Sequence, residues 1–201
     1  MAVVIVPDSK LKVILDGCIK HERASLKDLY AAYYGFGFNV CKRYLRSEEI
    51  TLEATHDGFI KIYNGLPDFK RPEVHIEKGL KPWMRKIFAR TGIDHLRRSK
   101  SEEWSTLSET MIEEIQLVNN ELAESRYSFK QLLELVGTLS PVYRSVFNLY
   151  VMDGFSHAEI AGMLGISESS SRSNLAKARA NLQKWLKAEN FQNKEYGRTA
   201  V

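Results

Sequence analysis

Small hydroxyl and cationic side chains recur near the carboxyl-terminal end of the chain, at spacings that place them on one side of a helix. At 100° per residue, this side holds Ser169, Ser170, Ser173, Lys177 and Lys184, with Arg172 and Ala176 at its margin. Arg and Lys bind phosphates and guanine edges, and serines let a helix backbone come close to a duplex. The pattern favours contact with the major groove of DNA. The alternative is an ordinary helical hairpin with a solvated polar face.

Other residues could in principle serve an enzyme. Cys18 and His21 have the spacing of metal ligands, but a stable zinc site usually takes four ligands and no second Cys/His pair lies nearby. Candidate acid–base groups are His56 with Asp57, His157 with Glu159, and His95. We expect His157 and Glu159 to serve a helix start and His95 to be packed on an apolar face. Since the chain also has no phosphate-cradling glycine loop and no nucleophile elbow, we predict no catalysis, metal, cofactor or small-molecule substrate.

The elements that must position the basic face are marked by local signals. Ser140-Pro141 predicts a helix start, because a serine hydroxyl can cap free backbone N–H groups and proline is tolerated at the first helical position. Asp153-Gly154 ends that helix. Ser156 to Glu159 forms a capping box, which predicts a second, short helix.

A tight turn follows the short helix. Gly165 can adopt a positive φ, and Ser167 can cap a third helix that opens with Glu168 near its positive end. The side of this third helix opposite the cations is expected to face the core; it carries Ser171, Leu175, Ala178, Leu182 and Leu186. The segment reads as helix, glycine turn, helix.

The first half of the chain is also helical in its periodicity. Amphipathic helices are predicted at 26–44, 48–66 and 83–98. Pro67 to Pro72 reads as a loop that continues through Gly79 and Pro82, because both residues disfavour helix interiors. Trp83 is expected to be core rather than an exposed stacking surface.

Composition limits the class of protein. The 201 residues are 44% hydrophobic, which suffices for one medium or two small cores. No apolar run reaches the roughly 20 residues of a membrane span, and no signal peptide is evident, so we expect a cytoplasmic protein. Cys18 and Cys41 are expected to be reduced, buried thiols.

The net charge of +4 is unevenly distributed. Residues 1–98 carry +6, residues 99–126 carry −5 and residues 127–201 carry +3. We therefore predict an all-α fold with two small helical domains joined by an acidic linker. The predicted boundaries are 1–98 for the first domain, 99–126 for the linker, 127–190 for the second domain and 191–201 for a carboxyl-terminal tail.

Two sets of motifs resemble one known family. The second domain carries Leu139 to Arg144, Phe155 to Ser167 and Arg172 to Arg179, which together resemble region 4 of extracytoplasmic-function sigma factors of the sigma-70 family. The first domain resembles region 2 through Leu29-Tyr30, Tyr33-Tyr34, Asp57 to Tyr63, Trp83 to Ile87 and Ile93 to Arg98. The matches cover roughly residues 18–98 and 129–187, in the family's order and separation.

The resemblance implies binding to core RNA polymerase, recognition of a promoter and help in opening the duplex. It assigns the minus-thirty-five element to the helix after the glycine turn, hence to Ser169, Ser170, Arg172, Ser173, Ala176 and Lys177. It assigns polymerase contacts to Glu53, His56, Asp57 and Lys61. It assigns bases captured at the minus-ten element to Phe69, Lys70, Arg71, Arg85, Lys86, Arg90, Arg97 and Arg98. Stacking and cations suit this last task, because flipped bases need stacking partners and a charged backbone needs counter-charge.

The resemblance further implies that the acidic linker threads the polymerase toward its active-site cleft and RNA exit path, and that an anti-sigma factor is a possible partner. Two other functions stay open. A helix-turn-helix regulator could act on DNA without polymerase, although it would need no basic helix at 83–98. A degenerate family member could serve as a protein-binding adaptor, because Thr51 to His56 is an unusual spelling of the polymerase-binding helix.

Overall fold

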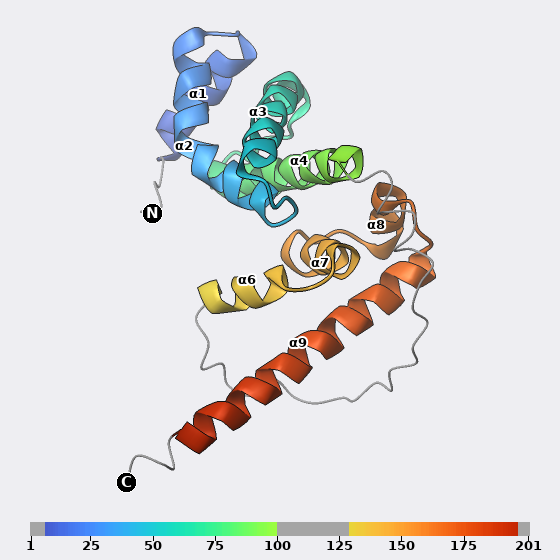
Figure 1. Ribbon diagram of the computed structural model, residues 1–201. Helices are drawn as coiled ribbons and strands as arrows, with labels where there is room; N and C mark the ends of the chain where they lie inside the picture. The colour runs from blue at the N-terminus through green and yellow to red at the C-terminus, as the bar shows by residue number, and fades with distance from the viewer. Residues whose placement is uncertain (1–6, 100–128, 197–201) are drawn as a thin grey trace. The chain divides into compact units, whose positions relative to one another are not determined.

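The computed structural model describes residues 7–99 and 129–196, and every regular element in these two ranges is helical (Figure 1). The predicted all-α fold is confirmed for this part of the chain. The chain divides into two compact units, Met1–Ser101 and Glu102–Val201, which are taken separately below. Apart from Ser99, the predicted linker 99–126 lies outside the described residues. Within them, no helix combines the length and apolarity needed to cross a bilayer.

The described part of the first unit contains α1 (Asp8–Ile19), α2 (Arg23–Lys42), α3 (Glu48–Gly65), a 3₁₀ turn (Leu66–Asp68) and α4 (Ile76–Ser99). α2 and α3 lie where the hydrophobic periodicity predicts them. α3 is capped as well: the Ser47 hydroxyl accepts a hydrogen bond from the Ile50 N–H at 3.3 Å.

The core of this unit is built around Phe88 of α4, which is fully buried. Its ring meets the ring of Phe59 of α3 edge-on, with centroids 5.2 Å apart. Glycines make room for it: a Cβ on Gly37 of α2 would lie 2.5 Å from Phe88, and one on Gly58 of α3 would lie 2.4 Å from it. Gly37 therefore allows close packing, although it weakens a helix interior.

Replacing Gly58 with Ala is expected to destabilise the first unit by about 1–3 kcal/mol, because the added methyl group must displace the Phe88 ring in a filled core. Urea unfolding of the full chain, followed by circular dichroism, measures the effect. Gly162→Ala in α8 is the matched control, since nothing lies within 4 Å of a Cβ there and alanine favours a helix. Equal unfolding midpoints for the two variants would refute the packing role of Gly58.

The predicted start of the last helix in this unit is wrong. α4 begins at Ile76, seven residues before Trp83, and includes both Gly79 and Pro82. Ile76 and Leu80 are buried in this first part, so their packing outweighs the local preference of glycine and proline for a loop. The loop before α4 consequently ends at His75.

α1 has no counterpart in the sequence prediction, although its apolar residues recur at helical spacing. Leu11, Ile14, Leu15 and Cys18 are all buried. The Asp8 carboxylate at its start accepts hydrogen bonds from the backbone N–H groups of His75, at 2.7 Å, and Ile76, at 3.1 Å. A residue at the start of α1 therefore caps the start of α4.

The described part of the second unit contains α6 (Phe129–Gly137), α7 (Pro141–Phe147), a π-helical turn (Asn148–Met152), α8 (His157–Leu164) and α9 (Glu168–Tyr196). α7 begins at the predicted position, but the Ser140 side chain makes no capping hydrogen bond. Gly154 ends the segment with φ +72°. α9 continues six residues past the boundary at 190 expected from the sequence.

Two parts of the second unit pack on the inner side of α9. Val136 and Leu139 form a buried cluster with Ala178 and Leu182, and Trp185 packs against its edge. Nearer the start of α9, the buried residues are Phe155, Ile160, Leu164, Ser171 and Leu175. The inward face predicted for this helix is confirmed at four of its five positions, and Leu186 is half-buried.

Candidate nucleic-acid interface

The second unit holds a helix-turn-helix made by α8 and α9. The Ser156 hydroxyl accepts a hydrogen bond from the Glu159 N–H at 3.2 Å, and the Glu159 carboxylate accepts one from the Ser156 N–H at 2.9 Å. This is the predicted capping box. Gly165 ends α8 with φ +68°, and the Ser167 hydroxyl then accepts from the Ser170 N–H at 3.0 Å. Each predicted signal of this motif is thus present.

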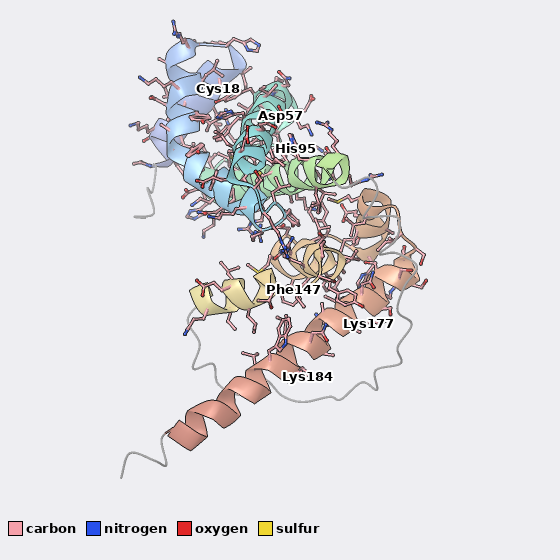
Figure 2. All side chains as sticks on the ribbon, viewed as in Figure 1. Cys18, Asp57, His95, Phe147, Lys177 and Lys184 are labelled. Atoms are coloured by element: carbon pink, nitrogen blue, oxygen red, sulfur yellow. The ribbon has the colours of Figure 1, made fainter. Side chains whose placement is uncertain are left out.

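The outer side of α9 near its start is polar and exposed. Ser169, Ser170, Arg172 and Ser173 are exposed, whereas Ala176 and Lys177 are half-buried. Figure 2 labels Lys177 and, two helical turns further along α9, Lys184. The hydroxyls of Ser169 and Ser170 each lie 2.8 Å from that of Ser167, so both also belong to the cap of the helix.

Arg172 forms an ion pair along the surface of α9. Its Nη2 lies 2.8 Å from Oε2 of Glu168, one turn earlier, and the two side chains are 60% and 45% exposed. Exposed pairs of this kind contribute little to stability. The guanidinium can therefore exchange Glu168 for a phosphate or a guanine edge at small cost.

His157 links α8 to α9, which the sequence prediction did not include. Its ring stacks on Tyr150 with centroids 4.5 Å apart, and its Nδ1 lies 2.9 Å from the Ser171 hydroxyl oxygen. Desolvation lowers the pKa of His157 below its usual value, and the Arg172 charge lowers it further. The imidazole is therefore neutral at pH 7 and acts as a brace between the two helices. Ser171, a hydroxyl on the inward face of α9, is the sequence signal that could have indicated such a contact, because a buried hydroxyl needs a hydrogen-bond partner.

In the first unit, three of the four predicted polymerase-binding residues of α3 have partners. His56 Nε2 lies 3.0 Å from the Tyr30 hydroxyl, and Lys61 Nζ lies 3.1 Å from Asp94. Asp57 and His95, labelled next to each other in Figure 2, are joined by a 2.8 Å contact between Oδ2 and Nε2. Glu53 is exposed. His95 is buried, as predicted, and holds Asp57 in a fixed orientation.

Two apolar side chains extend this face of α3 and were missed from the sequence. Leu52 is 38% exposed and Ile60 is 56% exposed. With His56 they recur every four residues, which places all three in one row. Leu52 and Ile60 add exposed apolar area to a face whose charged side chains form a polar rim, which suits a protein partner. The sequence could have shown this: the core of α3 is made by other positions of the helix, so Leu52 and Ile60, eight residues apart on another side, are left to face the solvent.

Basic side chains line the outside of α4. Lys86, Arg90 and Arg97 are exposed and separated by four and seven residues, so they share one face. Arg98 is exposed beside that face, while Arg85 is half-buried with its guanidinium 5.8 Å from the centre of the Phe36 ring. The predicted cations of this helix therefore form a basic strip, which Asp94 interrupts between Arg90 and Arg97. Arg85 is also committed to an aromatic contact.

The loop before α4 is more constrained than the sequence suggests. The rings of Phe69 and Trp83 are 4.8 Å apart, and both side chains are half-buried. Trp83 is therefore neither fully core nor a free stacking surface. Arg71 is ion-paired with Asp16 of α1 at 2.7 Å, and Lys70 is exposed.

The residues considered for enzyme chemistry are arranged differently. Cys18 is buried, and burial with the nearby Asp28 and Glu22 charges raises the pKa of its thiol to about 11, so it is protonated at neutral pH. His21, its suggested metal-binding neighbour, is exposed. In the two described ranges no three His, Cys, Asp or Glu side chains are grouped so that they could hold a metal ion.

The described geometry defines a helical protein with a helix-turn-helix in one unit and a basic, four-helix bundle in the other. Comparison with known families agrees with this description. Residues 29–102 match the model of sigma-70 region 2, and residues 129–182 match that of sigma-70 region 4. The chain belongs to the sigma-70 family, and it is a sigma factor of the extracytoplasmic-function group.

Individual relatives are distant but span most of the chain. RNA polymerase sigma factor YlaC of Bacillus subtilis is 27% identical over 172 residues, which cover 83% of this chain and 94% of the relative. The ECF RNA polymerase sigma factor SigM of Mycobacterium tuberculosis is 22% identical over 183 residues, covering 86% and 83%. Among solved structures, RpoE of Bartonella quintana, crystallised with the anti-sigma factor NepR, is 17% identical with a TM-score of 0.46; the match covers 80% of this chain and 96% of that one.

Proposed function

We propose that this chain binds core RNA polymerase, directs it to promoters through their minus-ten and minus-thirty-five elements, and promotes the start of transcription. The observation that carries the proposal is the presence, in one chain, of both a region 2 bundle and a region 4 helix-turn-helix in the family's order. Its partners are then core RNA polymerase and promoter DNA, with an anti-sigma factor as a further partner.

The proposed roles follow the exposed faces. The face of α3 that carries Glu53, His56, Asp57 and Lys61 binds polymerase, and Leu52 and Ile60 supply its apolar contacts. The outer face of α9, with its serines, Arg172, Ala176 and Lys177, enters the major groove at the minus-thirty-five element. The strip on α4 and the loop before it act on the opened minus-ten strand.

A regulator that binds DNA without polymerase is the second candidate. Only the helix-turn-helix supports it, because a regulator of this kind would also contain that motif. It leaves the exposed apolar row of α3 and the basic strip of α4 without a task. The sigma-factor proposal gives each of these surfaces a partner of the matching chemistry.

Run-off transcription with purified core RNA polymerase and this chain, on a library of promoters, tests the proposal. We expect discrete transcripts that depend on adding the chain, because polymerase without a sigma factor does not select promoters. Duplex binding without initiation at any promoter would favour the regulator. Absence of both duplex binding and initiation, with polymerase still bound, would favour the adaptor.

A further inference from the structure

α1 holds the loop before α4 at two points. Near the start of the loop, Arg71 Nη1 lies 2.7 Å from Asp16 Oδ1. At its end, the two carboxylate oxygens of Asp8 accept from the N–H groups of His75 and Ile76. Both acidic side chains lie on α1, two turns apart, so they grip the loop from the same helix.

The contact made by Asp8 stabilises the strained backbone of His75. His75 has φ +54°, a conformation that residues other than glycine rarely adopt. The first N–H groups of α4 would have no partner within the helix, and a carboxylate at that end also satisfies the helix dipole. Asp8 therefore compensates for the strain at His75 and fixes where α4 begins.

α4 holds the other side of the loop. Phe69 stacks against Trp83, and a Cβ on Gly79 would lie 2.6 Å from Pro72, so the loop passes very close to the helix there. Lys70, between Phe69 and Pro72, is exposed, and Val74, between Pro72 and the start of α4, is 69% exposed. The loop is thus fixed in shape and presents a few side chains outward.

We propose that α1 is a clasp that presets this loop for the minus-ten element, with Asp8 and Asp16 as positioning residues. This inference rests on the proposed function and deepens it. A loop already held in shape loses less conformational freedom when it captures a base, so the capture is tighter. In this role Arg71 acts through Asp16 and does not bind the DNA backbone, contrary to its assignment from the sequence.

The two roles of Arg71 predict opposite results for Asp16→Arg. If Arg71 binds DNA directly, the substitution removes an acidic group and adds a cation, so DNA binding should strengthen. If the clasp operates, the substitution replaces an ion pair with repulsion and releases the loop, so capture should weaken. An added positive charge that weakens DNA binding is specific to the clasp.

The test uses the complete chain bound to core RNA polymerase and a fluorescent fork promoter whose nontemplate strand is single-stranded at the minus-ten element. We expect Asp16→Arg to weaken binding about five-fold. The charge-swapped pair Asp16→Arg with Arg71→Asp should restore most of the affinity. Val13→Arg is the control: it also places an arginine on α1, at a side chain that is 70% exposed, and changes the net charge by +1 where Asp16→Arg changes it by +2. It should not weaken binding.

Tighter binding by Asp16→Arg, or no recovery in the charge-swapped pair, would overturn the clasp. A second measurement needs no DNA: hydrogen exchange in the free chain should speed up for residues 69–79 in both Asp8→Ala and Asp16→Arg. Unchanged exchange would also overturn it. If the unsubstituted complex fails to bind the fork promoter, the proposed function is wrong, and so is the role of the clasp in base capture. Faster hydrogen exchange in the two variants would then still show that α1 holds the loop in shape.

Discussion

Ile60→Glu is expected to weaken binding to core RNA polymerase about 30-fold or more. Ile60 is 56% exposed, the more exposed of the two apolar side chains in the α3 row, and lies near Asp57 and Lys61. Complete burial of an isoleucine side chain is worth about 1.5–3 kcal/mol, and a carboxylate in its place would have to be desolvated without a partner. Titration of labelled chain with core polymerase, followed by fluorescence anisotropy, gives the change in affinity.

Val13→Glu provides the control for this experiment. Val13 is apolar and 70% exposed on α1 of the same unit, but it lies outside the proposed interface. Its substitution should leave polymerase binding unchanged, and both variants should keep the circular dichroism spectrum of the unsubstituted chain. If Ile60→Glu binds as tightly as Val13→Glu, the α3 row is not the polymerase-binding face. Asp57 is a less informative position, because its replacement would also leave the buried His95 without its partner.

The helix-turn-helix could be predicted residue by residue because its determinants are local. The capping box spans four residues. Gly165 can adopt a positive φ because it has no Cβ, and Ser167 caps the helix that begins at the next residue. Both partners of each interaction lie within a few residues of one another, so the local sequence contains all the information needed to predict it. The failure of Ser140 to cap α7 is the exception, and there Pro141 alone marks the helix start.

The start of α4 could not be predicted in this way, because its cap comes from 67 residues earlier in the chain. Locally, Gly79 and Pro82 indicate a loop. Their preference is outweighed by the burial of Ile76 and Leu80 and by the Asp8 carboxylate, and no local pattern contains this information. α1 itself was predictable from its periodicity, but its role as a partner of the loop was not.

For the candidate site, the sequence identified side-chain chemistry better than it identified partners. Arg71 and Asp57 have the charges expected of binding residues, yet the structure pairs them with Asp16 and His95. Charge and spacing show which groups could bind a ligand. Only the packing of the other helices shows which of them are already held by the protein.

Arg172→Ala is expected to weaken binding of the polymerase complex to duplexes carrying the minus-thirty-five element by about 1–3 kcal/mol, which is five- to 150-fold. Arg172 is exposed in the first turns of α9, where a recognition helix meets base edges, and its pair with Glu168 is weak enough to be replaced. The loss should be smaller on a scrambled duplex, because a guanine contact exists on the matched sequence alone.

Lys177→Ala separates base recognition from backbone attraction on the same helix. If Lys177 binds a phosphate, its loss should weaken matched and scrambled duplexes alike, and the slope of log affinity against log salt should fall by about one unit. Lys184 is the control: it is exposed and lies about 18 Å further along α9 than Arg172, so Lys184→Ala should change both quantities less. Equal losses from Arg172→Ala on both duplexes, with a reduced salt slope, would make Arg172 a phosphate contact. Sequence discrimination would then have to come from the serines and Ala176, the small side chains that let the backbone of α9 approach the bases.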